Sequence, residues 1–158
     1  NDRIPLLLAT PAAGRFVSAE PLLGPLSLKE FMWPVHAQWP AGFRSAQAAA
    51  DAGATVSYHP QSLVAAHRKF LDWVIVGGES GPGARPMRPD WPRAIRDQCA
   101  ASGTPFMFKQ WGAYRPLDAA IPDADGEQPM FLTTKAYAGR ALDGQTHDAV
   151  APLPGVTP

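Results

Sequence analysis

The sequence predicts an α/β fold in which parallel strands are joined by βαβ crossovers. Three short apolar segments, at residues 16–19, 73–76 and 104–109, have the length and residue types of buried β-strands. A long connection separates the first two segments, and a helical pattern separates the last two. Because parallel strands need long crossovers whereas antiparallel strands can be joined by tight turns, this order favours a parallel sheet with right-handed connections.

Helices are predicted before and after the first strand in the sequence. Residues 2–9 have an amphipathic pattern that is typical of a helix lying on a sheet. The crossover at 29–70 contains two candidate helices, 45–52 and 61–70. The first of these begins at a serine, which is a favourable N-cap, and is followed by a glycine, which commonly ends a helix.

The helix between the second and third strands has the clearest signals at its ends. Asp90 is predicted to cap it, Pro92 lies in its first turn, and Gly103 ends it. One helix face carries apolar residues at four-residue spacing, so that face is predicted to pack on the sheet. Its residues are Trp91, Ile95 and Cys99.

The pattern weakens after the third strand. Residues 118–128 form a polar segment with prolines and are predicted to be a loop. A short strand is predicted at 130–132, followed by a helix over 134–142 that Gly144 stops. The last residues, 151–158, are expected to form a flexible tail.

Composition sets broad limits on function. The 158 residues include 14 basic and 14 acidic side chains, so bulk charge does not indicate a nucleic-acid or membrane partner. The apolar runs are far shorter than the roughly 20 residues of a membrane-spanning helix, and no signal peptide is recognisable. We therefore expect a cytoplasmic protein. The single cysteine cannot form an internal disulfide.

Polar residues follow each of the three predicted strands. In parallel α/β proteins, side chains beyond the carboxyl ends of the strands converge on one ligand-binding edge, and glycines there let a ligand approach the backbone. These strand ends present two carboxylates, a lysine and an amide. The predicted ligand-binding residues are Glu20, Gly77, Gly78, Glu79, Ser80, Arg85, Lys109 and Gln110.

Several of these residues also have a purely structural interpretation. Glu79 either contacts a ligand or pairs with Arg85 or Arg88 to hold its loop, and Glu20 has the same two alternatives. Lys109 and Gln110 should alternate between the two faces of their strand, so only one is expected to point into a barrel interior, and Lys109 is favoured. Trp111 is more typical of buried packing than of a platform for stacking a base.

Other kinds of site are less well supported. The glycines at 77–83 fit neither the dinucleotide fingerprint nor the P-loop, so a tight turn with close backbone approach is the favoured interpretation. Ser80 lacks the nucleophile-elbow pattern of hydrolases. The histidines have no metal-ligand spacing, and no metal site is predicted among them. They are His36, His59, His67 and His147.

Five motifs carry a resemblance to a known family. Taken together, they resemble the C-terminal half of a phage and bacterial family of unassigned function, whose complete members carry an N-terminal three-cysteine motif and resemble radical SAM enzymes with a TIM-type barrel. The motifs are FVSAEPLLG at 16–24, LDWVIVGGESGPGARPM at 71–87, DW at 90–91 with RDQC at 96–99, PFMFKQWG at 105–112 and AGRALDG at 138–144.

The resemblance implies a division of the chain. Residues 1–114 would be a partial α/β barrel with an inserted crossover at 29–70, residues 115–150 a loop and a C-terminal helix, and residues 151–158 a tail. The remaining strands would come from the N-terminal half of the same barrel. Without that half, the sheet would expose the edge of its first strand and also that of its third.

The resemblance also implies S-adenosylmethionine and an iron-sulfur cluster in the complete protein. Cys99 alone cannot hold such a cluster, so this chain is expected to contribute ligand contacts and to be inactive in radical chemistry by itself. The alternative is a non-catalytic module that binds a nucleotide or a phage or host partner. Whether the complete protein is an enzyme stays open at this point.

Overall fold

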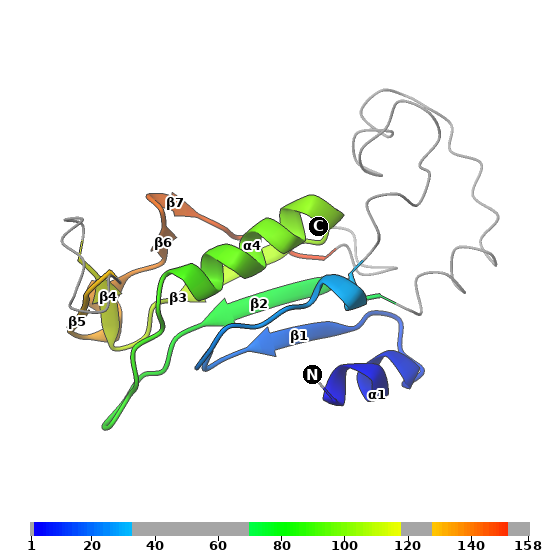
Figure 1. Ribbon diagram of the computed structural model, residues 1–158, viewed down its shortest axis with the longest axis horizontal. Helices are drawn as coiled ribbons and strands as arrows, with labels where there is room; N and C mark the ends of the chain where they lie inside the picture. The colour runs from blue at the N-terminus through cyan, green and yellow to red at the C-terminus, as the bar shows by residue number, and fades with distance from the viewer. Residues whose placement is uncertain (1, 33–69, 118–127, 152–158) are drawn as a thin grey trace.

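The computed structural model describes residues 2–32, 70–117 and 128–151. Its centre is a three-stranded parallel sheet in the order β1 (Phe16–Ala19), β2 (Trp73–Gly77) and β3 (Phe106–Gln110) (Figure 1). The predicted parallel α/β architecture is therefore confirmed. The described residues form an open sheet and no closed barrel.

One face of the sheet is buried beneath helices. Strand alternation puts Val74 and Val76 of β2 on this face, and both are fully buried. The helices α1 (Arg3–Ala9) and α4 (Asp90–Ser102) contribute Ile4 and Ile95 to the same apolar cluster. Burial of these side chains supplies the main driving force for docking the helices on the sheet.

The opposite face of the sheet is only partly covered. Phe16 is 51% exposed and lies against Trp73, with 5.6 Å between the ring centroids. The next rows of this face contain Ile75 and Met107, which are half-buried. Apolar side chains on a half-exposed sheet face are unusual for a sheet that is complete by itself.

The boundaries of α4 agree with the prediction at one end and differ at the other. Gly103 adopts the left-handed conformation (φ 71°) and ends the helix as predicted. Pro89, not Asp90, is the N-cap, and no side chain caps the first turn. Asp90 is instead the first helical residue, where it pairs with Arg93 at 3.2 Å. An acidic residue in the first turn is favourable because of the helix dipole.

The C-terminal part differs more from the prediction. β4 (Tyr114–Pro116), which was not predicted, pairs in antiparallel fashion with β5 (Met130–Leu132). The predicted helix over 134–142 is wrong beyond its first turn, because α5 (Lys135–Ala138) ends before Gly139. A small hairpin follows, formed by β6 (Ala141–Leu142) and β7 (Gln145–Thr146).

The hairpin follows from an Asp-Gly pair. Asp143 and Gly144 both have positive φ (53° and 77°), as a two-residue hairpin turn requires. Asp143 also binds Arg93 at 2.7 Å and Arg96 at 2.6 Å on α4. These hydrogen bonds lower the pKa of Asp143, with that from Arg93 the largest contribution. The turn thus connects the C-terminal hairpin to the helix layer.

The two sheet edges are not equivalent. The edge of β3 is partly covered, because Phe108 N donates to His147 O at 2.9 Å and Met107 forms a bridge with Asp148. The expectation that this edge would be exposed is therefore wrong there. Among the described residues, β1 pairs only with β2.

Four predicted elements cannot be compared with the structure in full. The helices at 45–52 and 61–70 and the tail at 151–158 fall almost wholly outside the described residues, as does most of the loop at 118–128. The described start of the long crossover contains a short 3-10 helix, η1 (Lys29–Phe31). It is linked to α4 because Leu28 N donates to Gln98 Oε1 at 2.7 Å.

Candidate functional site

The carboxyl ends of β1, β2 and β3 converge on one carboxylate. Glu20, which follows β1, accepts a hydrogen bond from Lys109 Nζ at 2.9 Å and another from Gln110 Nε2 at 3.2 Å. Gly77 is at the end of β2, between the ends of β1 and β3, and a Cβ on Gly77 would be 2.9 Å from Glu20 Oε1. Glycine at this position therefore leaves room for the carboxylate. We call Glu20, Gly77, Lys109 and Gln110 the strand-end site.

A bulge in the sheet explains how Lys109 and Gln110 both reach Glu20. Val76 pairs with Phe108 and Gly77 pairs with Gln110, so Lys109 is the extra residue on β3. A bulge breaks the strict alternation of side chains along a strand. Both side chains therefore reach Glu20, and the expectation that only one of them points into a barrel interior stays a prediction. Lys109 is the more exposed of the pair, and Gln110 is buried.

Gln110 brings an unpaired acceptor to the site. Its amide nitrogen donates to Glu20 Oε1 and to Gly78 O, at 3.2 Å and 3.0 Å, which fixes the orientation of the amide. Its Oε1 has no hydrogen-bond partner within the described part of the chain, although the residue is only 4% exposed. Buried polar atoms are nearly always hydrogen-bonded, so this oxygen is an unsatisfied acceptor at the strand-end site.

Glu79 is engaged within its own loop. Arg85 binds both carboxylate oxygens of Glu79, at 2.8 Å and 3.0 Å, and its backbone N–H donates to Oε2 at 2.9 Å. The side-chain hydrogen bond from Arg85 is the main reason that the pKa of Glu79 falls to about 2. This is the loop-holding pair considered from the sequence. Ser80 is exposed in the same loop, and ligand contacts by these three residues stay a prediction.

Two glycines permit a close crossing of backbone segments. A Cβ on Gly78 would lie 1.9 Å from Trp111 O, and one on Gly112 would lie 2.1 Å from Glu79 O. The crossing is closed by Gly78 N donating to Gln110 O at 2.9 Å and Ala113 N donating to Glu79 O at 2.8 Å. The close backbone approach predicted for the glycines at 77–83 is thus found at Gly78, whereas nothing lies within 4 Å of a Cβ on Gly81 or Gly83.

Trp111 is a buried packing residue. It is 3% exposed, its Nε1 donates to Ala141 O at 2.8 Å, and its ring meets that of Phe108 edge-on, with 4.9 Å between centroids. Both the apolar ring and the polar nitrogen are thus satisfied inside the protein. The favoured interpretation of this tryptophan is confirmed.

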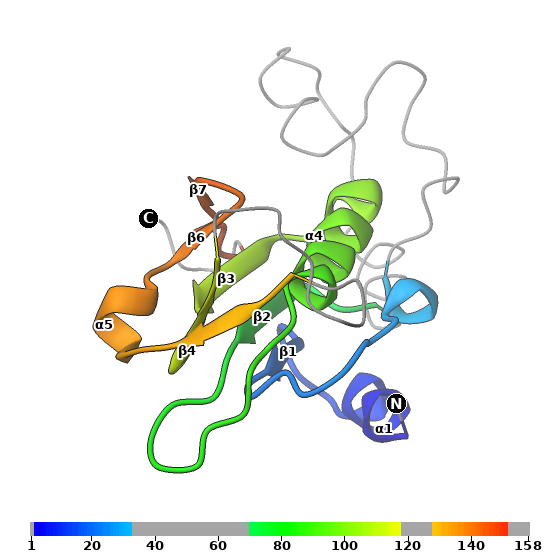
Figure 2. The same cartoon turned by 60° about the vertical axis from the view of Figure 1, so that its left-hand side comes forward.

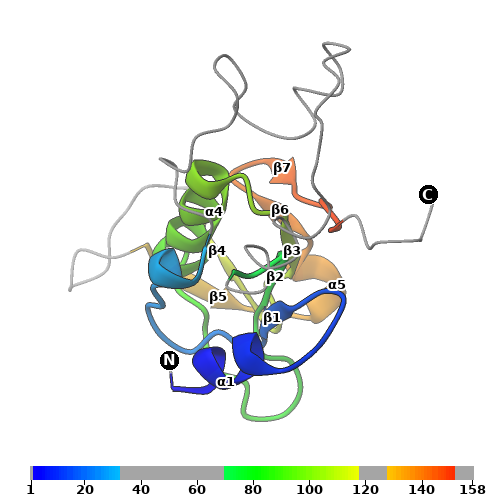
Figure 3. The ribbon, with the colours of Figure 1, turned by 90° about the vertical axis from the view of Figure 1, so that its right-hand side faces the viewer.

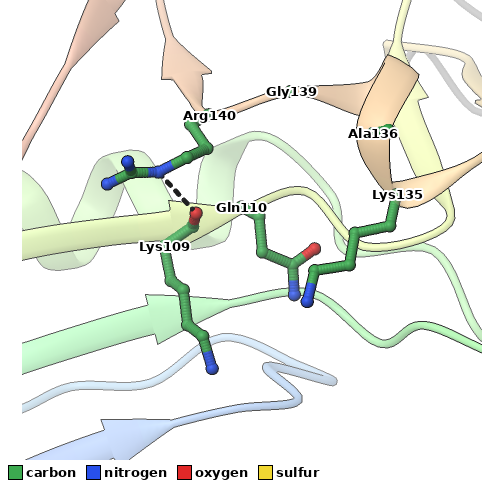
Figure 4. A pocket seen from close by; sticks show the side chains of 6 residues that line it. All are labelled: Lys109, Gln110, Lys135, Ala136, Gly139 and Arg140. Carbon is green, nitrogen blue, oxygen red and sulfur yellow. Dashed lines mark hydrogen bonds between the residues drawn. The ribbon is translucent and has the colours of Figure 1, made fainter.

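A pocket of about 590 Å³ opens beside the strand-end site (Figure 4). Figures 2 and 3 show α5, which forms one wall, away from α4 on a different side of the sheet. Arg140 donates from Nε to Lys109 O at 3.0 Å and pairs with Asp148. We call the pocket beside the strand-end site the cationic pocket. It is lined by Lys109, Gln110, Lys135, Ala136, Gly139 and Arg140.

Sequence reasoning missed Lys135 and Arg140. Both lie in the segment that was predicted as one continuous helix, where they would have been ordinary surface cations. The structure instead ends α5 at Ala138, so the chain turns at Gly139 and brings Arg140 back to β3. The available signal was the pair of glycines that frames the AGRALDG motif.

The described residues do not form a metal centre. Cys99 is fully buried on α4, and burial raises the pKa of its thiol to about 12. Such a thiol is not a ready metal ligand, because the thiolate is the coordinating form. Within the described ranges, no cluster of three or more His, Cys, Asp or Glu side chains has the geometry to hold a metal ion. His147 lies against Phe106.

Comparison with known proteins identifies the family. Residues 1–151 match the family model described as "Protein of unknown function (DUF5131)". The chain belongs to this family. The expected resemblance to a family of unassigned function is thus confirmed. The description of this family names no activity, substrate or cofactor.

No curated protein and no solved structure matches the chain. In the part of the chain that the structure describes, no helix has both the length and the apolar character needed to cross a membrane.

Proposed function

We propose that this DUF5131 chain is the C-terminal portion of a radical-SAM-like barrel protein and holds a small-molecule ligand at the carboxyl ends of its strands. One observation carries the proposal. Glu20, Lys109 and Gln110 join the ends of the first and third strands across Gly77, and the buried Gln110 Oε1 is left for an external donor. Ligands of parallel α/β proteins bind at this end of the strands.

The arrangement of the sheet supports a barrel. The three strands lie side by side in chain order, as in singly wound barrels, whereas doubly wound sheets reverse their order at a switch point. The helices α1 and α4 pack on one face, and the other face is apolar but half-exposed. In a barrel this second face would be the interior. The N-terminal half of the same protein would then supply the strands that cover it.

The cofactors implied by the family resemblance do not fit the residues of this chain. A radical SAM cluster needs three thiolates, and the single cysteine is buried and protonated at neutral pH. No reaction step is therefore assigned to these residues. In this proposal the cluster and S-adenosylmethionine belong to the complete protein, and the present chain contributes ligand contacts and barrel closure.

A second candidate is a non-catalytic module that binds a nucleotide or a phage or host partner. It is favoured by the pairing of both strand-end carboxylates, Glu20 with Lys109 and Glu79 with Arg85. Glu79 is a poor general base, because the Arg85 guanidinium lowers its pKa and holds it in the charged, weakly basic form. Binding without turnover needs no free base.

The reading frame upstream of Asn1 separates the two candidates. A cysteine triad followed by further strand patterns in the same frame supports the barrel, and a start codon close to Asn1 supports the module. The biochemical test is anaerobic reconstitution with iron and sulfide, followed by an absorbance spectrum. The 158-residue chain should take up no cluster, whereas the complete protein should. A cluster band from this chain alone would contradict the assignment of Cys99 as a packing residue.

A further inference from the structure

The cationic pocket gathers positive charge from two parts of the chain. Lys109 comes from the end of β3, whereas Lys135 begins α5 and Arg140 follows it (Figure 4). The Arg140 guanidinium donates to Lys109 O, which holds the two sides together. The volume of the cationic pocket, about 590 Å³, lies within the range of roughly 300–1,000 Å³ that is usual for small-molecule sites.

The charges of the pocket do not cancel. Lys109 is paired with Glu20, and Arg140 is paired with Asp148. Lys135 forms no ion pair with any residue that the structure describes. One positive charge is therefore left over, and the flexible stem of Lys135 lets its amine follow a ligand. Attraction to one positive charge grows linearly with the charge of the ligand, whereas the cost of desolvating the ligand grows with the square of its charge. The surplus therefore favours an anion with a single negative charge, such as a carboxylate, over a doubly charged phosphate.

The pocket also contains a fixed acceptor. Gln110 Oε1 is buried and unpaired among the described residues, and its amide cannot turn over without losing the bonds to Glu20 and Gly78 O. A carboxylate alone would not satisfy this oxygen, because both groups are acceptors. The bound molecule must bring an N–H or O–H donor as well.

We infer that the cationic pocket binds a small organic acid whose carboxylate meets Lys135 and Lys109 and whose hydroxyl or amide N–H donates to Gln110 Oε1. This inference rests on the proposed function, since it names the ligand class for the same strand ends. It adds Lys135 and Arg140 to the site. It also adds a donor requirement that charge alone would not predict.

Four matched probes test the inference by NMR titration of the protein. Gluconate carries both a carboxylate and hydroxyl donors, sorbitol has the hydroxyls without the charge, and hexanoate has the charge without the hydroxyls. Glucose 6-phosphate replaces the carboxylate by a phosphate. The signals to follow are the side-chain amide of Gln110 and Nε–H of Arg140. Gluconate should shift both and bind most tightly, and added salt should weaken it.

A charge variant provides the second measurement. Lys135→Gln should weaken gluconate binding by roughly three- to fivefold, the range expected for an exposed charge contact. Lys29→Gln makes the same chemical change on η1, outside the pocket, and should leave the affinity unchanged. Because Lys135 is exposed, neither variant should disturb folding.

The outcomes separate this inference from the proposed function. Equal shifts by sorbitol and gluconate would overturn the anion requirement while leaving a ligand site at the strand ends. Equal binding of hexanoate would overturn the role of Gln110 Oε1, and tighter binding of glucose 6-phosphate would overturn the choice of carboxylate. If all four probes leave Gln110 and Arg140 unshifted, the inferred ligand class is wrong, and the barrel is still tested by the upstream reading frame.

Discussion

Two carboxylates follow neighbouring strands of the same sheet, yet they have different roles in the structure. Glu20 reaches partners 89 and 90 residues away, Lys109 and Gln110, and so connects the ends of β1 and β3. Glu79 reaches Arg85, only 6 residues away, and closes its own loop. Both are acidic residues that follow the end of a strand in the sequence. The comparison teaches that the sequence separation between the partners of an ion pair matters. A large separation marks a site that joins different strands, and a small one marks a pair that holds a single loop.

The largest expected effect is on stability, and it concerns the close backbone crossing at Gly78 and Gly112. Gly78→Ala would force a Cβ to within 1.9 Å of Trp111 O, and a backbone atom cannot move aside cheaply. We expect the free energy of unfolding to fall by at least about 3 kcal/mol. Denaturant unfolding measures this. Gly24→Ala is the matched control, since nothing lies within 4 Å of its Cβ position, and a similar loss there would contradict the explanation.

The next effect concerns the half-exposed sheet face behind the strand-end site. If that face is a barrel interior, the 158-residue chain should self-associate through it and through the β1 edge. Phe16→Glu places a charge on this face and should shift the chain towards monomer in sedimentation velocity. Leu132→Glu, on exposed β5, should not. A wild-type chain that is already a well-behaved monomer would mean a self-contained open sheet and would sink the barrel proposal.

A smaller effect compares the two ion pairs directly. In a double-mutant cycle, Glu20→Gln and Lys109→Gln should show a coupling of about 0.5–1 kcal/mol, because the pair is partly exposed. Amide chemical shifts should change at the ends of both β1 and β3. Glu79→Gln should change shifts only around its own loop, residues 79–85. Shift changes from Glu79→Gln that spread to β1 would remove the distinction between the two carboxylates.

The smallest effect is the titration of Glu79. Its pKa in the folded protein is about 2, below the usual 4.5, because of the Arg85 hydrogen bonds. A lowered pKa means that this pair stabilises the fold above about pH 4.5 and that the contribution is lost as pH falls towards 2. Carboxyl NMR should give a midpoint near 2, and Arg85→Gln should move it up towards 4.5. A midpoint near 4.5 in the unmodified protein would show that the pair does not persist in solution.

Much of the sheet layer could be predicted from local sequence patterns. The three apolar segments became β1, β2 and β3, and their order along the chain became their order in space. The stop at Gly103 was also predictable, because a glycine after a helical stripe has a specific backbone role. The prediction of a helix over 134–142 was wrong because it gave the helix-forming residues around Gly139 more weight than the Asp-Gly turn signal at 143–144.

The sequence by itself determined which segments form the central sheet, that these three strands are parallel, and that polar residues follow their ends. These features depend on short-range periodicity and on the length of crossovers. Only the tertiary structure decided how those polar residues are paired. The bulge at Lys109 gives Glu20 two partners from one strand, and the turn at Gly139 carries Arg140 back to β3. Both depend on backbone register between distant segments, which no local pattern encodes.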